Sequence, residues 1–492
     1  MHKQILRLAV PAILTNITVP LLGIVDLAIA GHTPSPGGAA VVLGAISVGG
    51  LIFNMVYWIF NFLRISSSGL TAQAYGSNNP AAQRQVLRLG VKIGLIAGLA
   101  IILLQWPILQ VAHILIAPTD GVWQLASTYY NIRVWGAPAV LCLFAVNGWL
   151  IGMQNAVYPM WLAIFQNLTN ILLSACFVFV FGMGIAGIAL GTLLSQWLGV
   201  LFIGALMFRK YRFVFGRTDN TESAPGIPLS RYFQTNLDIF FRMLLMIVVT
   251  CSVTAIGARQ GDTLLAVNTL LMQFFTLFSY FSDGFAAAGE ALSGRFYGAR
   301  QPVLLRTAVR QLFLWAFLIA VVFTAVYAFG GMSLLGLLTD DVSLLPAVST
   351  YLPWGIAIPV ASFATFAWDG IYIGLTATRQ MLWSIVWATV LFFAVFFLPN
   401  LLSSLFTPEW RFFNLHSEGF GAAWEVPLKG DLEGPIFTLH SSLLTDPNHR
   451  LWLAFIIYLV VRSVAQTLMA PRLLSLSQTK TEHGGEAVRL TC

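Results

Sequence analysis

The sequence is poor in charge: Asp, Glu, Lys and Arg together make up only 9% of its 492 residues. A soluble globular domain carries roughly 25% charged residues, so this chain cannot cover a large surface that faces water. Cysteine is also scarce. The four cysteines have neither the spacing of a disulfide framework nor that of a metal site. No H-E-x-x-H pair is present among the seven scattered histidines. We therefore expect no catalytic residues, no metal site and no organic cofactor.

Long apolar runs are abundant by contrast, and 58% of the residues are hydrophobic. A helix that spans a membrane needs roughly 20 consecutive apolar residues. By this measure the sequence predicts twelve spanning helices, over residues 5–32, 40–70, 88–112, 122–151, 157–180, 184–208, 233–257, 263–290, 305–330, 345–375, 380–401 and 449–470. The predicted fold class is an all-α integral membrane protein.

Basic residues indicate how these helices are oriented. The net charge is +7, and most of the 26 Lys and Arg residues fall in segments on the same side as the N-terminus. Lys and Arg are retained on the cytoplasmic side of a bilayer, and an even number of spans returns the chain to its starting side. We therefore expect both termini to be cytoplasmic. Lys and Arg residues on the cytoplasmic side of the lipid bilayer explain the net positive charge of the chain. We therefore predict no nucleic-acid partner.

An internal repeat divides the chain. The segment TAQAYGSNNPAAQRQVLR (71–88) matches SGRFYGARQPVLLRTAVR (293–310) in Tyr, Gly, Pro and two Arg positions, at an offset of 222 residues (293 minus 71). The same offset pairs NGWLIG (147–152) with DGIYIG (369–374). The alternative is a favourable turn used twice. Two ungapped matches instead predict two lobes of six helices in the same orientation, as in transporters that bind substrate between their repeats.

These matches set the predicted domain boundaries. The N-lobe covers residues 1–215, a cytoplasmic linker covers 216–232 and the C-lobe covers 233–492. Residues 402–448 are too polar to span the membrane and too long for a tight turn, so we expect an extracytoplasmic loop inserted in the C-lobe.

Ionisable residues inside the spans are functional candidates, because placing a charge in the hydrocarbon core costs free energy that a functional role must justify. Asp238 and Arg242 are four residues apart on one helical face. Together with Arg64 they are expected to form a structural ion network near the cytoplasmic gate. Asp283 and Asp369 lie deeper and are expected to line a cavity in the C-lobe.

Two further arginines, Arg133 and Arg462, fall nearer the outer side of their spans. Arginine side chains near a helix end can extend to the membrane surface, and we expect both to do so in part. The remaining walls of a central cavity should be aromatic and rich in Met, since flat and polarisable side chains accept varied organic cations. Candidates are Met55, Trp58 and Met272.

Asp26 stands apart from this set, since it lies in the apolar run VPLLGIVDLAIAGH (19–32) with no charge close to it. A low-dielectric environment disfavours the ionised form of a carboxyl group, so Asp26 is the candidate to bind and release a proton. Pro20 permits a bend in the same helix that this titration could drive. In the alternative, Ser, Asn or backbone groups, such as those of Asn16 or Asn170, hydrogen-bond Asp26 and the carboxyl group never titrates.

The order of these motifs resembles the MATE (multidrug and toxic compound extrusion) family, and within it the DNA-damage-inducible F (DinF) branch. The resemblance is carried by LAVPAILTNITVPLLGIVDLAIAGH (8–32), FNFLRISSSGLTAQAYG (60–76), NLDIFFRM (236–243), AVNTLLMQFFTLFSYFSDGFAAAGEALSGRFYGAR (266–300) and WDGIYIGLTATRQM (368–381). It implies a MATE/MOP-type fold in the bacterial cytoplasmic (inner) membrane. It also implies export of amphipathic or cationic small molecules by antiport with alternating access. The first-helix Asp, the family's proposed proton site, falls on Asp26.

The chain also departs from the family pattern. Ser174 stands where the family often has a second Asp, and Leu22 replaces a Tyr one turn before Asp26. The loss of one carboxylate weakens the case for Na⁺, so we expect H⁺ as the coupling ion, with Na⁺ as the alternative. The alternative cargo is a lipid-linked oligosaccharide, moved by a flippase of the same superfamily. We expect a monomer.

Overall fold

The computed structural model describes residues 1–32, 38–216, 228–336, 344–406 and 446–482. Most of the predicted linker (217–227) and most of the predicted extracytoplasmic loop (407–445) lie outside the described residues. The elements are all helical within the described ranges, and twelve spans are long and apolar enough to cross a membrane. The twelve predicted spans are thereby confirmed.

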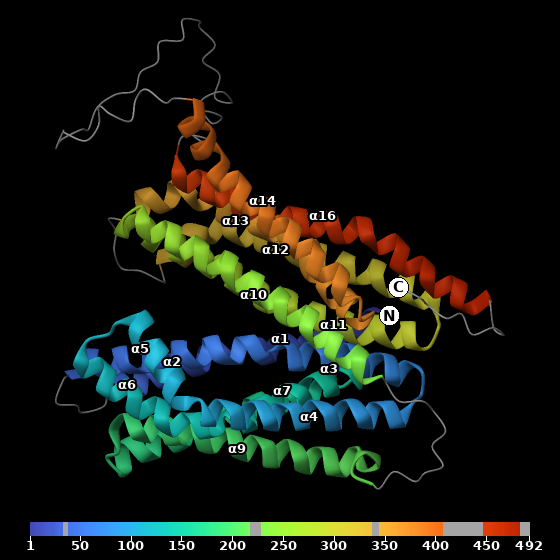
Figure 1. Cartoon of the computed structure of the whole chain (residues 1–492), viewed down its shortest axis with the longest axis horizontal. Helices are drawn as coiled ribbons and strands as arrows, with labels where there is room; N and C mark the ends of the chain where they lie inside the picture. The colour runs from blue at the N-terminus through green and yellow to red at the C-terminus, as the bar shows by residue number, and fades with distance from the viewer. Residues whose placement is uncertain (33–37, 217–227, 337–343, 407–445, 483–492) are drawn as a thin grey trace, which may run out of the picture.

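The first lobe, drawn from blue to green in Figure 1, holds the helices of the first repeat. They are α1 (His2–Gly31), α2 (Gly38–Phe60), α3 (Phe62–Gly76), α4 (Pro80–Leu103), α5 (Gln105–Ile116), α6 (Asp120–Arg133), η1 (Val134–Gly136), α7 (Ala137–Gly152), α8 (Val157–Ala175), η2 (Cys176–Val180), α9 (Gly184–Lys210) and η3 (Arg212–Val214). Three spans combine successive elements: α2 with α3, α6 with η1 and α7, and α8 with η2.

The second lobe, from green to red, repeats this order with longer helices. They are α10 (Leu229–Arg259), α11 (Asp262–Gly298), α12 (Pro302–Gly336), α13 (Leu345–Gly374), α14 (Thr378–Phe406) and α16 (Pro447–Glu482). Helix α10 begins at Leu229, four residues before the predicted boundary of the C-lobe, because the polar first turn carries no hydropathy signal.

The internal repeat is confirmed by backbone geometry. Asn78 and Arg300 have φ values of 50° and 55°, and they are related by the 222-residue offset. Close helix contacts repeat as well. A Cβ atom at Gly148 would collide with the carbonyl oxygen of Arg64, and one at Gly370 would collide with the equivalent carbonyl of Ala286. Both turns and packing contacts therefore occur twice, which a locally favourable turn would not produce.

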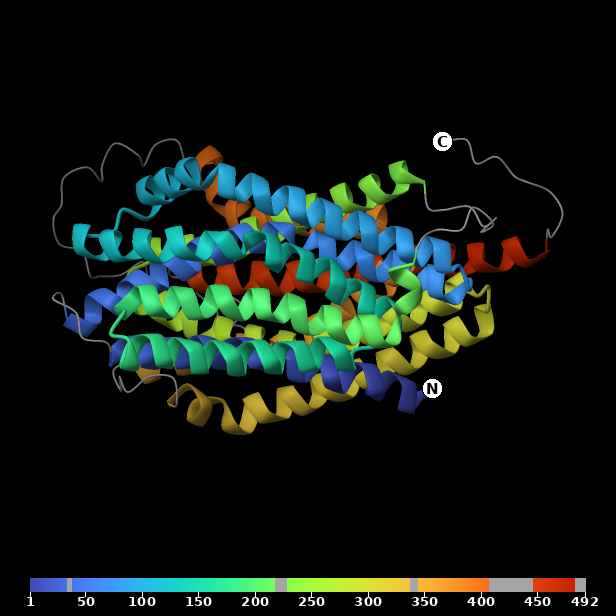
Figure 2. The same ribbon diagram turned by 90° about the horizontal axis from the view of Figure 1, so that it is seen from below.

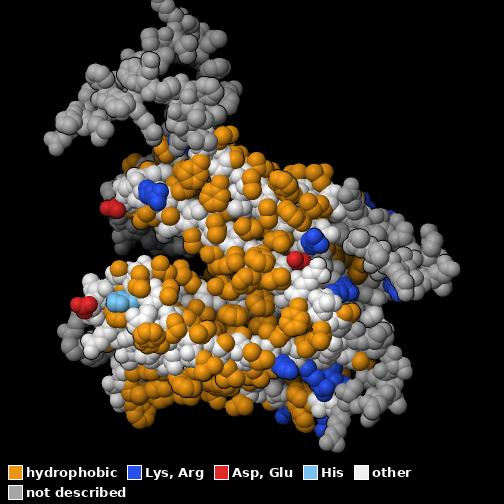
Figure 3. All heavy atoms as spheres, in the orientation of Figure 1, with side chains coloured by type: hydrophobic (Ala, Val, Ile, Leu, Met, Phe, Trp, Pro, Cys, Tyr) orange, Lys and Arg blue, Asp and Glu red, His pale blue; other side chains and the backbone are white. Residues whose placement is uncertain are grey.

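The two lobes form a V in Figure 1, and a hollow separates them at one end of the molecule in Figure 3. Figure 2 shows α1 beginning, and α16 ending, at the other end of the molecule. We call that end the terminal side and the hollow between the lobes the cleft. Hydrophobic side chains cover much of the visible surface, and Leu103 and Phe329 are 83% and 93% exposed, as expected for residues that face lipid.

At the terminal side the lobes are in direct contact, in a region that we call the seal. Ser66 of α3 donates a hydrogen bond to Oδ1 of Asn236 on α10 (2.7 Å), and Gln154 donates to the carbonyl oxygen of Ala291 on α11 (2.7 Å). Glycines permit the close approach. Cβ atoms at Gly76 and Gly298 would collide with backbone atoms of the opposite lobe. The cleft is therefore closed at the terminal side and open at the other.

Candidate functional site

Asp26 lies near the end of α1 in the half of the N-lobe away from the seal. Its side chain is half-buried, and its buried Oδ1 has no hydrogen-bond partner within the described residues. Neither of the expected amide partners reaches it. Asn16 donates to the carbonyl oxygen of Tyr280 on α11 (3.0 Å), and Asn170 donates to Oγ1 of Thr192 (2.9 Å). Neither asparagine therefore forms the hydrogen bond to Asp26 that the alternative interpretation requires.

Helices α8 and α9 carry uncharged polar side chains inside the N-lobe. Asn170 and Ser174 lie one turn apart on α8, and each is almost fully buried. The Oδ1 of Asn170 and the Oγ of Ser174 have no hydrogen-bond partner among the residues described. Ser174 faces α9, where a Cβ atom at Gly191 would collide with it. These side chains therefore offer unused oxygen atoms but no charge.

Arg133, at the end of α6, is an intramembrane basic residue in the same half of the N-lobe as Asp26. Its Nη1 donates to the hydroxyl of Tyr129 (2.8 Å), and its guanidinium lies over the ring of Phe53 (4.7 Å). No ion pair joins Arg133 to Asp26 in the described structure, but Val25 and Ile29, which flank Asp26, pack in the same apolar core as Phe53 and Tyr129. Aromatic side chains thus hold the guanidinium of Arg133 within the lobe. The residues next to Arg133 in the sequence did not predict these aromatic contacts.

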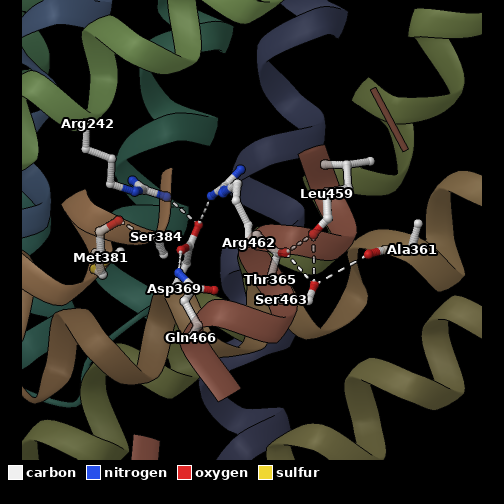
Figure 4. Close-up of polar contacts among 10 residues, drawn as sticks. All are labelled: Arg242, Ala361, Thr365, Asp369, Met381, Ser384, Leu459, Arg462, Ser463 and Gln466. Carbon is white, nitrogen blue, oxygen red and sulfur yellow. Dashed lines mark hydrogen bonds and ion pairs between the residues drawn. The ribbon is translucent and has the colours of Figure 1, made fainter. Parts of the chain in front are cut away.

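In the C-lobe, Asp369 of α13 is the centre of a buried ion network. It pairs with Arg242 of α10 and with Arg462 of α16 (2.8 Å), and Gln466 donates to its other oxygen (2.8 Å). Figure 4 shows the carboxylate between the two guanidinium groups. Asp369 and Arg462 are 8% and 3% exposed. The expectations that Asp369 lines a cavity and that Arg462 extends to the surface are therefore wrong.

The expected network of Arg64, Asp238 and Arg242 does not form as a unit. Asp238 accepts a hydrogen bond from Thr378 of α14 (2.8 Å) instead of pairing with Arg242. Arg64 approaches Glu290 of α11 at 3.7 Å. This ion pair joins the two lobes at the base of the cleft. Four-residue spacing places two side chains on one helical face, but the neighbouring helices decide which partner each one takes.

Asp283 is exposed, yet it lies in the middle of the long span α11. It lies seven residues before Glu290 on the same face of α11, and Glu290 pairs with Arg64 of the N-lobe. Asp283 is thus exposed on the face of α11 that carries Glu290, and the expectation that it lines a cavity stays a prediction.

The three predicted wall residues have different surroundings. Met55 and Trp58 on α2 are 50% and 47% exposed. Met272 on α11 is half-buried and packs against the apolar core of the C-lobe. Their part in binding cargo stays a prediction.

Comparison with known proteins identifies the family that has this architecture. A family model described as MatE matches residues 11–176 and 239–398, one segment in each lobe. This chain belongs to the MatE family. Among its relatives, the DNA damage-inducible protein F of Escherichia coli (strain K12) is 37% identical over 384 residues, which cover 77% of this chain and 82% of that protein. A probable multidrug resistance protein NorM of Acinetobacter baylyi is 24% identical, over 77% of this chain and 85% of the relative.

Solved structures show the same fold for this MatE chain. A crystal structure of MATE in the straight conformation superposes with a TM-score of 0.77 at 18% identity and covers 97% of both chains. The chain is therefore a multi-pass membrane protein with the two-lobe MATE architecture, and the resemblance seen in its motifs is confirmed.

Proposed function

We propose that this protein exports amphipathic cationic compounds across the bacterial inner membrane, with both termini in the cytoplasm, and that inward proton movement through Asp26 drives the export. The single observation that carries the proposal is the buried Oδ1 of Asp26, which has no hydrogen-bond partner among the residues that the structure describes. An ionisable group in the membrane without a fixed partner is a functional site by default. Relatives described as multidrug resistance proteins support the same class of cargo.

The two lobes supply the alternating access that antiport requires. In this structure the seal closes the terminal side and the cleft opens to the other side. A proton that arrives through the cleft neutralises Asp26, and α1 then repacks around Pro20, which lies within the helix. Repacking displaces cargo from the N-lobe, and release of the proton to the other side resets the site. Transporters commonly rock two repeats about a central site in this manner.

Asp26→Asn tests the proposal. In proteoliposomes with an imposed pH gradient, we expect gradient-driven transport of a fluorescent organic cation to fall by about tenfold or more, because the amide cannot exchange a proton. Asp238→Asn is the matched control, since its carboxylate is bound by Thr378, and it should retain transport. If Asp26→Asn exports as well as the parent, the proton assignment is wrong.

The charges on the cleft favour cationic cargo over an anionic lipid-linked sugar. Arg242 and Arg462 are paired with Asp369, and Arg64 is paired with Glu290. A flippase for anionic cargo needs unpaired basic groups where the two lobes meet. There these three arginines are paired, whereas Asp283 of α11 is exposed. We propose that Asp283 attracts the positive charge of the cargo.

Asp283→Asn should therefore separate cargoes by charge. We expect the apparent affinity for a cationic dye to weaken by about 3- to 10-fold, the effect of roughly 1 kcal/mol in a partly solvated charge pair. Export of a neutral amphipathic compound should be unchanged. Equal losses for both cargoes would show that Asp283 is a structural residue. The measurement is the concentration dependence of export in proteoliposomes, with Asp238→Asn again as the control.

A further inference from the structure

We propose that Arg133 is the built-in counter-cation of Asp26, and that it makes the N-lobe site accept a proton while excluding Na⁺. The proposal rests on the proposed function, because it assigns the ion that drives the same site. It also explains how proton binding weakens the hold on a cationic cargo.

Arg133 differs from the other intramembrane arginines in its partners. Arg64, Arg242 and Arg462 each pair with a carboxylate. Arg133 instead donates to the neutral hydroxyl of Tyr129 and lies over aromatic rings, and its buried Nε has no hydrogen-bond partner among the described residues. A buried charge is expensive unless it is paired. Val25 and Ile29, which flank Asp26 on α1, pack in the same apolar core as Phe53 and Tyr129, the aromatic residues that hold Arg133. Neither Asp26 nor Arg133 has an ionic partner among the described residues, so we assign them to each other as counter-ions.

The other groups around Asp26 are neutral. Of the helices that pack on α1, α8 and α9 present Asn170, Ser174 and Thr192, while Tyr57 comes from α2. Tyr129 and Tyr130 belong to α6 beside Arg133. The acidic groups of α11 lie at the far end of the contact. Tyr280 accepts a hydrogen bond from Asn16, ten residues before Asp26, and Asp283 follows Tyr280 by one turn of α11. Arg133 is therefore the cation that governs the charge of this site.

This pairing gives the site two charge states. When Asp26 is ionised, carboxylate and guanidinium together are neutral. When Asp26 binds a proton, the charge of Arg133 is left uncompensated, and it repels a cationic cargo from the same lobe. Arg133 thus converts proton binding into electrostatic expulsion of the cargo.

Arg133 also opposes Na⁺. A metal cation needs several oxygen ligands, whereas a proton needs one lone pair. The guanidinium already occupies the hydroxyl oxygen of Tyr129, and its positive charge repels Na⁺ from the carboxylate of Asp26. Without Arg133, the unpartnered oxygens of Asp26, Asn170 and Ser174 would be free to bind Na⁺.

The first test uses the unmodified protein and three variants in proteoliposomes. Replacing Na⁺ by choline at fixed pH should leave export by the parent unchanged. Arg133→Gln should gain at least about threefold stimulation by Na⁺. Its pH midpoint for transport should rise by about 1 unit, because removal of a nearby positive charge makes protonation of a carboxylate easier. Na⁺-dependent export by the parent would overturn the proposal.

Two tyrosine variants provide an opposite shift and a matched control. Tyr129→Phe removes the hydroxyl that holds Arg133, so the guanidinium should pair more fully with Asp26 and the pH midpoint should fall. Tyr130→Phe removes a neighbouring hydroxyl that has no partner in the described structure, and it should leave the midpoint unchanged. A purely structural role for Arg133 would not shift the midpoint in opposite directions. Unchanged midpoints in both Arg133→Gln and Tyr129→Phe, each monodisperse in detergent, would overturn the proposal.

Failure of this inference can be told from failure of the proposed function. If Asp26→Asn exports like the parent, the proton site itself is wrong, whatever Arg133 does. If Asp26→Asn loses export while Arg133→Gln keeps the parent's pH profile and Na⁺ independence, only the role of Arg133 fails.

Discussion

Asp369→Ala is expected to destabilise the protein by about 3–5 kcal/mol, the loss seen when one partner of a buried ion pair is removed. The side chain is almost fully buried, and its removal leaves the guanidinium groups of Arg242 and Arg462 without a counter-ion. Two like charges would then face each other in a low-dielectric environment. The measurement is thermal and denaturant unfolding of the purified protein in detergent.

Two further variants show whether the network is the cause. Arg462→Met should cost less than Asp369→Ala, because the carboxylate keeps its ion pair with Arg242 and the total charge becomes balanced. Asp238→Ala removes a carboxylate that is held by one hydrogen bond from Thr378, so it should cost only about 1 kcal/mol. If Asp369→Ala is no less stable than Asp238→Ala, the buried network does not stabilise the C-lobe.

Gly298→Val is expected to reduce transport to background by holding the lobes apart at the seal. The new side chain would collide with the backbone of Gln73 in the opposite lobe. Backbone cannot move aside as the end of a flexible side chain can, so the lobes must separate. Gly76→Val should have the same effect, because it collides with the backbone at Arg295, the position related to Gln73 by the repeat.

The separation can be measured directly. Spin labels at Ser77 and Gln301, which are both exposed at the terminal side, should report longer distances in Gly298→Val than in the parent when both are placed in a cysteine-free background. Gly204→Val is the matched control, because nothing lies within 4 Å of its added Cβ atom. It should keep the parent's distances and its transport. Loss of transport in Gly298→Val with unchanged distances would contradict the proposed role of the seal.

The sequence predicted the architecture well because hydropathy and repetition are properties of the chain itself. Apolar runs must match the thickness of the bilayer, and the Tyr-Gly-x-x-x-Pro motif marks the same turn in both lobes. Helix ends were less predictable. The span of α2 and α3 continues past the predicted end at residue 70 to Gly76, since hydropathy ends with the membrane whereas a helix continues to its turn at Asn78.

Partners of charged side chains were the part that could not be predicted. Asp369 pairs with residues 127 and 93 positions away, so no local spacing indicates the network. Asp238 and Arg242 share a helical face, but Asp238 accepts a hydrogen bond from a residue of α14, whereas Arg242 pairs with a residue of α13. Likewise, the aromatic surroundings of Arg133 depend on how α2 packs beside α6. Asp26 was identifiable because its feature is the absence of a charged neighbour, which the sequence does display.

The repeat relates Asp369 to Asn147 in the first lobe, where the equivalent side chain is neutral. One copy of the duplicated unit is thus braced internally by ions, while the other leaves its own carboxylate uncommitted. We therefore expect the C-lobe, with its buried ion network, to deform less than the N-lobe during transport.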